Sequence, residues 1–227
     1  LHHLLAQDPA NRVPRCGQTI YPYPEHPAAG RGAGPARVNR QLRAFERLVP
    51  ELRSLHPFDA YSPQECTEIT GHTFASLRFD ITHEIPSYRR WLAATGHRPA
   101  YRFHKRFLQH LQRQAGAGLW VLKSPDHVLA LDTIAEVYPD ARVVFVHRDP
   151  LKVLPSSCRL TEVLRRPFTR HLDRLRIGKQ VSNDWAAAAA KLIQASEAES
   201  ASRPNRIFHI QYRSLVTEPF RTVAALY

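Results

Sequence analysis

A lysine and a histidine stand close together after an apolar run at residues 119–122. Lys123 ends the run, Ser124 and Pro125 are typical of a helix N-cap and a first helical residue, and His127 then falls in the first turn. The positive end of the helix disfavours imidazolium there, so we expect His127 to be neutral near pH 7 and able to accept a proton. The pair predicts a cation for an anionic group beside a proton acceptor. The alternative is a solvated lysine and a histidine that only caps or packs.

A second apolar run, residues 142–147, ends at Arg148, whose guanidinium can bind a phosphate through two hydrogen bonds. The Asp149-Pro150 pair predicts the N-cap and first residue of another helix. Pro155 follows five residues later, so we expect this helix to kink or pause and to leave the Ser156 hydroxyl available for a phosphate. Alternatively, Arg148 pairs with a nearby carboxylate and Ser156 is an ordinary helix residue.

The elements that must position these residues are predicted by continuous apolar runs. Residues 119–123, 142–148 and 206–212 are typical of strands covered on both faces. A helical pattern at residues 128–137 lies between the first two runs, and this order indicates a βαβ crossover in a parallel sheet. The predicted fold class is therefore α/β, and ligands of such sheets lie beyond the carboxyl ends of the strands.

The first half of the chain is predicted to be mainly helical. Apolar residues recur at helical spacing in residues 38–55 and 101–112, and residues 63–85 are expected to be largely helical. Residues 8–35 carry six prolines and four glycines, which predicts a long loop. Both ends of the chain have helical patterns without caps, so residues 1–227 are interpreted as a single domain truncated at both ends.

Composition excludes some classes of protein. With 43% hydrophobic residues, the chain is neither a disordered tail nor a disulfide-stapled miniprotein. The net charge of +12 favours polyanionic partners. The three cysteines have no CxxC spacing, so we expect neither a disulfide framework nor a zinc site. No apolar run is long enough for a membrane span and no signal peptide is visible, so a cytoplasmic, reducing compartment is expected.

Three stretches of the sequence resemble the sulfotransferases that use 3′-phosphoadenosine 5′-phosphosulfate (PAPS), and especially their bacterial branch. The stretches are LKSPDH at residues 122–127, YPDARVVFVHRDP at residues 138–150 with Ser156, and FHIQYRSLVTEP at residues 208–219. The resemblance implies that Arg148 and Ser156, eight positions later, hold the 3′-phosphate of PAPS. It further implies that Tyr212 helps to define the nucleotide pocket and that Lys123 neutralises the transferring sulfuryl group.

The resemblance also implies a P-loop-like parallel sheet with flanking helices, and sulfuryl transfer from PAPS to a hydroxyl or amine of a small acceptor without a metal. The family's first strand and phosphate loop are missing, and residues 1–6 resemble the helix after that loop. Residues 1–227 would then hold the 3′-phosphate end of the donor but lack much of the sulfuryl cradle. His127 is the predicted general base. Because cytosolic members place this histidine two residues after the lysine rather than four, Glu65, Glu68 and Asp59 are alternatives.

Other classes of function also have signals in the sequence. A nucleic-acid-binding module is suggested by residues 159–179, which hold seven basic residues and two acidic ones, although a solvated basic face explains the same run. We therefore expect no nucleic-acid partner. The His147-Arg148-Asp149 motif also occurs in protein kinases, but Leu154 stands where a kinase has asparagine. A non-catalytic nucleotide-binding protein of the same fold is a further alternative.

Overall fold

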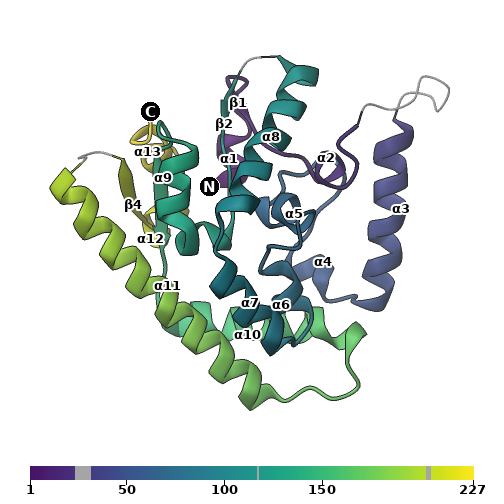
Figure 1. The fold of residues 1–227 in the computed structure, drawn as a ribbon. Helices are drawn as coiled ribbons and strands as arrows, with labels where there is room; N and C mark the ends of the chain where they lie inside the picture. The colour runs from purple at the N-terminus through teal and green to yellow at the C-terminus, as the bar shows by residue number, and fades with distance from the viewer. Residues whose placement is uncertain (24–31, 117, 203–205) are drawn as a thin grey trace. The chain divides into compact units, whose positions relative to one another are not determined.

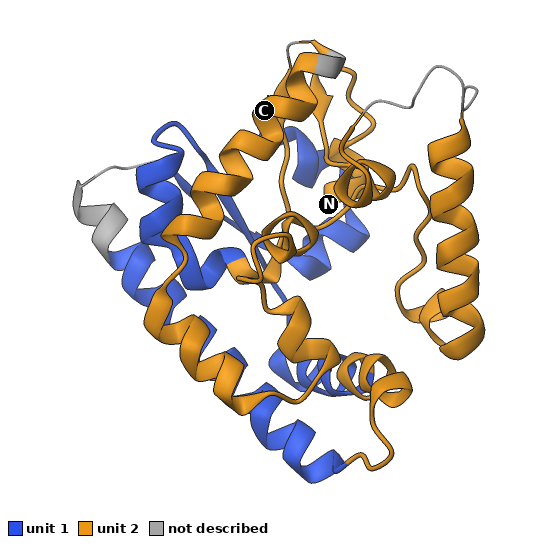
Figure 2. Ribbon diagram, turned by 45° about the vertical axis from the view of Figure 1, so that its right-hand side comes forward, with its two compact units in different colours: residues 1, 127–159, 173–227 blue, residues 2–126, 160–172 orange. Residues whose placement is uncertain are grey.

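The computed structural model describes residues 1–23, 32–116, 118–202 and 206–227 (Figure 1). The chain forms two compact units, coloured separately in Figure 2. Unit 1 comprises Leu1, His127–Arg159 and Asp173–Tyr227, and unit 2 comprises His2–Asp126 and Leu160–Leu172. Each unit combines helices with a two-stranded parallel sheet. The fold class is therefore α/β, as predicted.

Unit 1 is organised around a parallel pair of strands. Its elements are α9 (Leu131–Val137), β3 (Val143–His147), the part of α10 (Pro150–Arg165) before Leu160, α11 (Arg174–Ser202), β4 (Ile207–Gln211), α12 (Tyr212–Thr217) and α13 (Pro219–Ala224). The register pairs Val143 with Ile207 and His147 with Gln211. The β-branched and aromatic residues of both runs favour strands, and the strands predicted at residues 142–148 and 206–212 are confirmed.

Helix α10 runs through Pro155 without interruption. The predicted pause at Pro155 is therefore wrong. Proline removes one backbone donor, the one that would bond the Leu151 carbonyl, but the helix has 16 residues and the turns on either side continue it. The Ser156 hydroxyl is exposed on a regular helix rather than at a break in it.

Unit 2 is mainly helical. Its elements are α1 (His2–Leu5), β1 (Asn11–Arg12), α2 (Cys16–Ile20), α3 (Ala33–Leu48), α4 (Leu52–Leu55), α5 (Cys66–Gly71), α6 (Arg78–Thr82), α7 (Pro86–Thr95), α8 (Arg98–Ala115), β2 (Leu119–Trp120) and η3 (Arg166–Phe168). β1 and β2 are parallel, with Asn11 opposite Leu119. The strand predicted at residues 119–123 is therefore shorter than expected.

Two predictions about strands and loops are wrong. In the described part of the chain, β2 pairs with β1 and β3 pairs with β4 in separate sheets, so residues 119–148 do not form the expected βαβ crossover within one parallel sheet. The long loop predicted at residues 8–35 contains β1, α2 and the start of α3, while residues 24–31 lie outside the described residues. β1 obtains its hydrogen-bond partners from β2, more than 100 residues away, and local composition does not encode such pairing.

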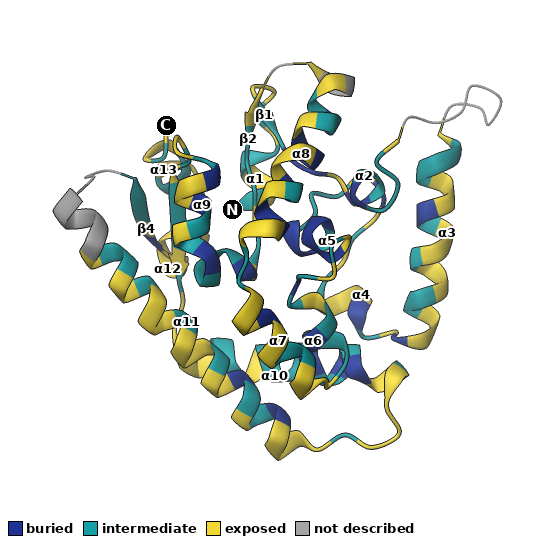
Figure 3. Cartoon of the chain, viewed as in Figure 1, coloured by how far each residue is buried: buried dark blue, intermediate teal, exposed yellow. Residues whose placement is uncertain are grey.

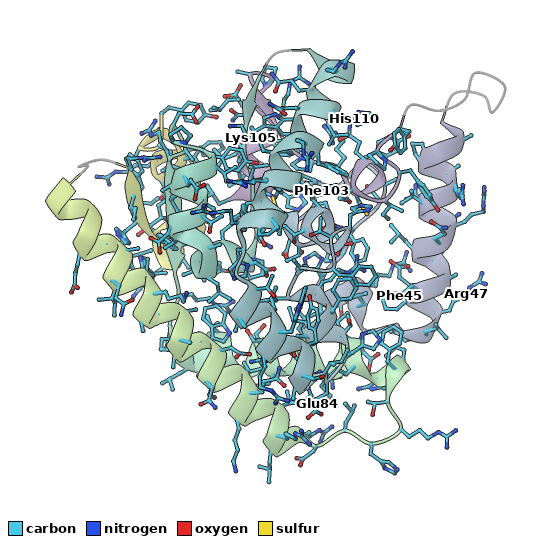
Figure 4. All side chains as sticks on the ribbon, viewed as in Figure 1. Phe45, Arg47, Glu84, Phe103, Lys105 and His110 are labelled. Atoms are coloured by element: carbon cyan, nitrogen blue, oxygen red, sulfur yellow. The ribbon has the colours of Figure 1, made fainter. Side chains whose placement is uncertain are left out.

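The core of unit 2 lies where amphipathic helices turn their apolar faces inward (Figure 3). On α8, Tyr101, Phe107, Leu108 and Leu111 are buried, which confirms the helix predicted at residues 101–112. Figure 4 labels three other residues of α8: Phe103, Lys105 and His110. Of these, Lys105 is exposed.

The helix predicted at residues 38–55 is divided into two. α3 ends at Leu48 and α4 begins at Leu52, because Pro50 cannot donate the hydrogen bond that would continue α3. Val49 and Leu52 nevertheless join Val163 in a buried cluster. Leu48, predicted to face the core, is exposed. Within residues 63–85, α5 and α6 are helical, but they leave about half of the stretch in turns and irregular structure, so it is less helical than predicted.

Arg165 is a buried cation, and we expect its replacement to destabilise the protein. Its guanidinium donates to the Asp80 carbonyl at 2.7 Å and to the Ile81 carbonyl at 3.3 Å. Replacing Arg165 by methionine should lower the free energy of unfolding by about 2–4 kcal/mol, because two carbonyls lose charged donors inside the protein. Urea unfolding measures the change. Exposed Arg170→Met is the control and should change stability by less than about 0.5 kcal/mol. Equal effects of the two variants would contradict this role.

Three further observations concern the thiols, the helices and the possible metal ligands of the described residues. Cys16, Cys66 and Cys158 are free. None of the described helices is both long and apolar enough to cross a bilayer. Within the same residues, His, Cys, Asp and Glu side chains form no group of three or more suited to a metal ion.

Candidate active site

Arg148 and Tyr212 meet at the carboxyl ends of β3 and β4. The register pairs His147 with Gln211, so the residues that follow them stand side by side. The guanidinium carbon of Arg148 lies 4.7 Å from the centre of the Tyr212 ring. Such an exposed cation–π contact contributes about 0.5–1 kcal/mol and leaves the edge of the guanidinium for hydrogen bonds. Two of the three residues predicted to bind the nucleotide are therefore brought together.

Ser156 is the third of these residues, and it is positioned by α10. Oδ1 of Asp149 accepts a hydrogen bond from the Leu151 amide at 2.9 Å, which confirms the predicted N-cap. Ser156 lies six residues beyond Pro150, about 9 Å along the helix axis. Joint binding of one phosphate by Arg148 and Ser156 stays a prediction.

Two histidines lie on one face of this strand pair. Nε2 of His147 and Nδ1 of His209 are 2.7 Å apart, so the imidazoles share a hydrogen bond. Burial, followed by repulsion from His209, lowers the pKa of His147. Because a shared hydrogen bond needs one nitrogen without a proton, the two rings are not both cations in this arrangement. Arg148 then supplies the permanent positive charge at the end of β3.

Lys123 is held against α5 in unit 2. The Cys66 amide, the first of α5, donates to the Lys123 carbonyl at 2.9 Å and so joins the two backbones. The Lys123 ammonium donates a hydrogen bond to Oε1 of Glu65 in an ion pair. Nε2 of His56 lies 3.7 Å from the same oxygen. The predicted sulfuryl-binding cation therefore has a carboxylate partner and an imidazole nearby.

Glu65 is ionised at every physiological pH. Burial raises its pKa, but hydrogen bonding with His56 and the charge of Lys123 outweigh burial and lower the pKa to about 2. A carboxylate with so low a pKa is a weak proton acceptor. While it contacts Lys123, Glu65 therefore balances charge rather than acting as a base.

The other two candidate bases have different surroundings. Glu68 forms an ion pair with Arg78, and burial raises its pKa. Asp59 accepts hydrogen bonds from the amides of Tyr61 and Ser62, both at 2.8 Å. Burial raises the pKa of Asp59 and these hydrogen bonds lower it, with a net downward shift. Of the three carboxylates considered from the sequence, Glu65 is the one placed against Lys123.

The segment after Lys123 forms η2 (Pro125–Ala130), a 3-10 helix rather than the predicted first turn of an α-helix. Ser124 Oγ accepts a hydrogen bond from the Asp126 amide at 3.2 Å, as expected of an N-cap. Oδ2 of Asp126 accepts one from the Leu77 amide at 3.0 Å. His127 lies in the first turn of η2, and its role as a base stays a prediction.

Asp126 should make stability depend on pH. Burial raises its pKa to about 7, whereas an unfolded aspartate titrates near pH 3.9. Folding therefore takes up a proton between these values, and the Asp126 contribution to stability falls as pH rises through this window. Between pH 4 and pH 7, the wild-type protein should lose about 2–4 kcal/mol of its free energy of unfolding through Asp126, and Asp126→Asn should not show this loss. Urea unfolding at several pH values measures both profiles. The exposed Asp132→Asn is the control. Parallel pH profiles for wild type and Asp126→Asn would refute this prediction.

A sequence model described as the Sulfotransferase family matches residues 1–227. The chain belongs to the sulfotransferase family. Two crystal structures of sulfotransferases are similar to all of this chain. For STF1 from Mycobacterium tuberculosis H37Rv, the TM-score is 0.79 with 26% identity and 62% of that chain covered. For STF9 from Mycobacterium avium, the TM-score is 0.84 with 26% identity and 58% covered. The predicted family and fold are confirmed.

A curated member of the family is also similar. Over 113 residues, this sulfotransferase-family chain is 27% identical to the omega-hydroxy-beta-dihydromenaquinone-9 sulfotransferase Stf3 of Mycobacterium bovis and of Mycobacterium tuberculosis. The match covers 47% of this chain and 27% of Stf3. The chain therefore spans about three fifths of the solved relatives and matches about a quarter of Stf3.

Sequence reasoning missed part of this arrangement. It included Glu65 only as an alternative base and did not connect it with Lys123, which is 58 residues away. It did not single out His209 or Asp126. Strand alternation was the available signal for His209. It lies between Phe208 and Ile210, so its side chain is on the opposite face of the strand from theirs.

Proposed function

We propose that this chain belongs to an enzyme that transfers the sulfuryl group of PAPS to a hydroxyl or amine of a small molecule. Family membership and the likeness to two mycobacterial sulfotransferases support the proposal. The observation that carries it is the placement of Arg148 against Tyr212 at the carboxyl ends of two parallel strands. That edge is where α/β sheets bind nucleotides.

The proposed donor site combines a fixed cation with a hydroxyl. Arg148 and Ser156 would bind the 3′-phosphate, and Tyr212 would border the nucleotide. The arrangement fits an anionic nucleotide because the Tyr212 ring covers one face of the guanidinium and phosphate binding uses its edge. PAPS would supply a sulfuryl group on a phosphate leaving group.

Lys123 is proposed to act on the transferring group. Sulfuryl transfer resembles phosphoryl transfer in spreading negative charge over peripheral oxygens, so the protein mainly positions the reactants and stabilises that charge. An ammonium at this place stabilises the transition state more than the ground state. A general base that takes the acceptor proton contributes about 10²- to 10⁴-fold, and His127 is the residue predicted for it.

The proposed acceptor is defined by its reacting group. Stf3 is named for a hydroxylated menaquinone, and a hydroxyl acceptor is the corresponding proposal for this chain. The proposal names a class of acceptor, small molecules with a hydroxyl or amine group, and no individual compound.

A binding experiment separates this proposal from nucleic-acid binding. Two of the basic residues in 159–179 make contacts within the protein: Arg165 is buried, and Arg166 forms ion pairs with Glu51 and Glu162. We expect immobilised 3′,5′-ADP to retain the protein at about 0.15 M salt, and free 3′,5′-ADP to elute it. Retention by duplex DNA but not by 3′,5′-ADP would contradict the proposed function.

A further inference from the structure

The Lys123 ammonium shares a carboxylate with a neighbouring imidazole. Its ammonium and the His56 imidazole both lie against Oε1 of Glu65. The Glu65 side chain is 21% exposed, against 48% for Lys123 and 41% for His56. The carboxylate therefore belongs to the least exposed of the three side chains. The hydrogen bond from the Cys66 amide to the Lys123 carbonyl keeps the two backbones together.

An anionic donor must compete with this carboxylate. In the proposed function, Lys123 neutralises the sulfuryl group, but its charge is already matched by Glu65. A carboxylate and a sulfonated phosphate at one ammonium repel each other. Because the Lys123 side chain is half exposed, its ammonium can exchange Glu65 for another anion that arrives from solvent. The lysine stem is flexible, so its ammonium can turn from one anion to the other while the backbone stays in place.

We propose that Glu65 is an internal counter-ion of Lys123 and that the sulfuryl end of the donor displaces it. The proposal rests on the proposed function, because it takes PAPS as the competing anion. Glu65 is then a positioning residue, which keeps the Lys123 ammonium near the position where it would contact the sulfuryl group. The low pKa of Glu65 supports this role, since the carboxylate stays charged at working pH.

The test compares two ligands that differ in the sulfuryl group. Calorimetric titration would measure the affinities of the full chain for PAPS and for 3′,5′-ADP, with and without Glu65→Gln. We expect the variant to bind PAPS about 3- to 10-fold more tightly, because Lys123 no longer leaves a charged partner. Its affinity for 3′,5′-ADP, which has no sulfuryl group, should change less than about 2-fold. Unchanged or weaker PAPS binding would overturn the proposal.

A double-mutant cycle separates exchange from a general effect of charge. In a Lys123→Met background, Glu65→Gln should no longer favour PAPS, because the cation that exchanges is gone. A gain that persists in this background shows a field effect and overturns the proposal. Glu51→Gln is the matched control, since it removes a carboxylate from the ion pair with Arg166 in the same unit. It should leave the affinity for both ligands unchanged.

Two further measurements keep the result interpretable. Thermal unfolding shows whether Glu65→Gln is folded, and if it is not, Glu65→Ala should give the same selective gain for PAPS. Wild-type protein that binds neither PAPS nor 3′,5′-ADP would contradict the proposed function itself. Wild-type binding of both ligands, with no selective gain in either Glu65 variant, would overturn only the counter-ion role.

Discussion

In the enzyme to which this chain belongs, replacement of Lys123 by methionine is expected to lower the rate of sulfuryl transfer from PAPS by about 10²- to 10³-fold. The ammonium would face charge that grows as the bond to sulfur breaks, so its loss acts mainly on the transition state. The 3′-phosphate is assigned to other residues, and the affinity for 3′,5′-ADP should therefore change less than about 3-fold. Initial rates with 2-naphthol as the hydroxyl acceptor, together with calorimetric titration of 3′,5′-ADP, measure both quantities.

Lys105→Met is the control for this experiment. Lys105 is an exposed lysine on α8 of the same unit (Figure 4), and its replacement removes the same charge. Its rate should stay within about 2-fold of wild type. If Lys123→Met transfers sulfuryl groups as fast as Lys105→Met, the role assigned to Lys123 is wrong.

Arg148→Ala should weaken 3′,5′-ADP binding by about 10- to 100-fold, because it removes charge-assisted hydrogen bonds to the 3′-phosphate. Folding should change little, since Arg148 is exposed and its contact with the Tyr212 ring contributes about 1 kcal/mol at most. Calorimetric titration gives the affinity, and urea unfolding gives the stability.

The same strand offers a matched control. Arg142 directly precedes β3, and its guanidinium carbon lies 4.6 Å from the centre of the Phe208 ring. Arg142→Ala therefore removes the same charge and a similar cation–π contact at the opposite end of β3. It should keep 3′,5′-ADP binding within about 2-fold of wild type. Equal losses in both variants would show a general effect of charge rather than a phosphate site at Arg148.

The sequence predicted the parts of the fold that are encoded locally. β3 and β4 are continuous apolar runs rich in β-branched and aromatic residues, so strands were the expected result. The N-cap role of Asp149 followed from its place before Pro150. α8 was predicted from apolar spacing alone.

Elements that depend on distant partners were not predictable in this way. β1 consists of two residues in a proline-rich stretch, and it is a strand because β2 provides its partners. The division between α3 and α4, by contrast, is encoded locally, because Pro50 interrupts the backbone hydrogen bonds, and the shared apolar pattern concealed it.

The contacts of the candidate site were partly predictable. The family resemblance assigned both Arg148 and Tyr212 to nucleotide binding, and the two side chains are in contact. The ion pair of Lys123 with Glu65 was not predictable, because it depends on how α5 packs beside the segment after β2. Asp126 is buried and accepts a hydrogen bond from the Leu77 amide, 49 residues away, and such a contact leaves no local sequence pattern.

The binding of a 3′-phosphate is the central claim, and one comparison of ligands tests it most directly. 3′,5′-ADP and 5′-AMP differ in the 3′-phosphate that Arg148 and Ser156 would hold. We predict that the wild-type protein binds 3′,5′-ADP at least about 10-fold more tightly than 5′-AMP, by calorimetric titration, and that Arg148→Ala removes most of this difference. Equal affinity of the wild-type protein for both nucleotides would contradict the account.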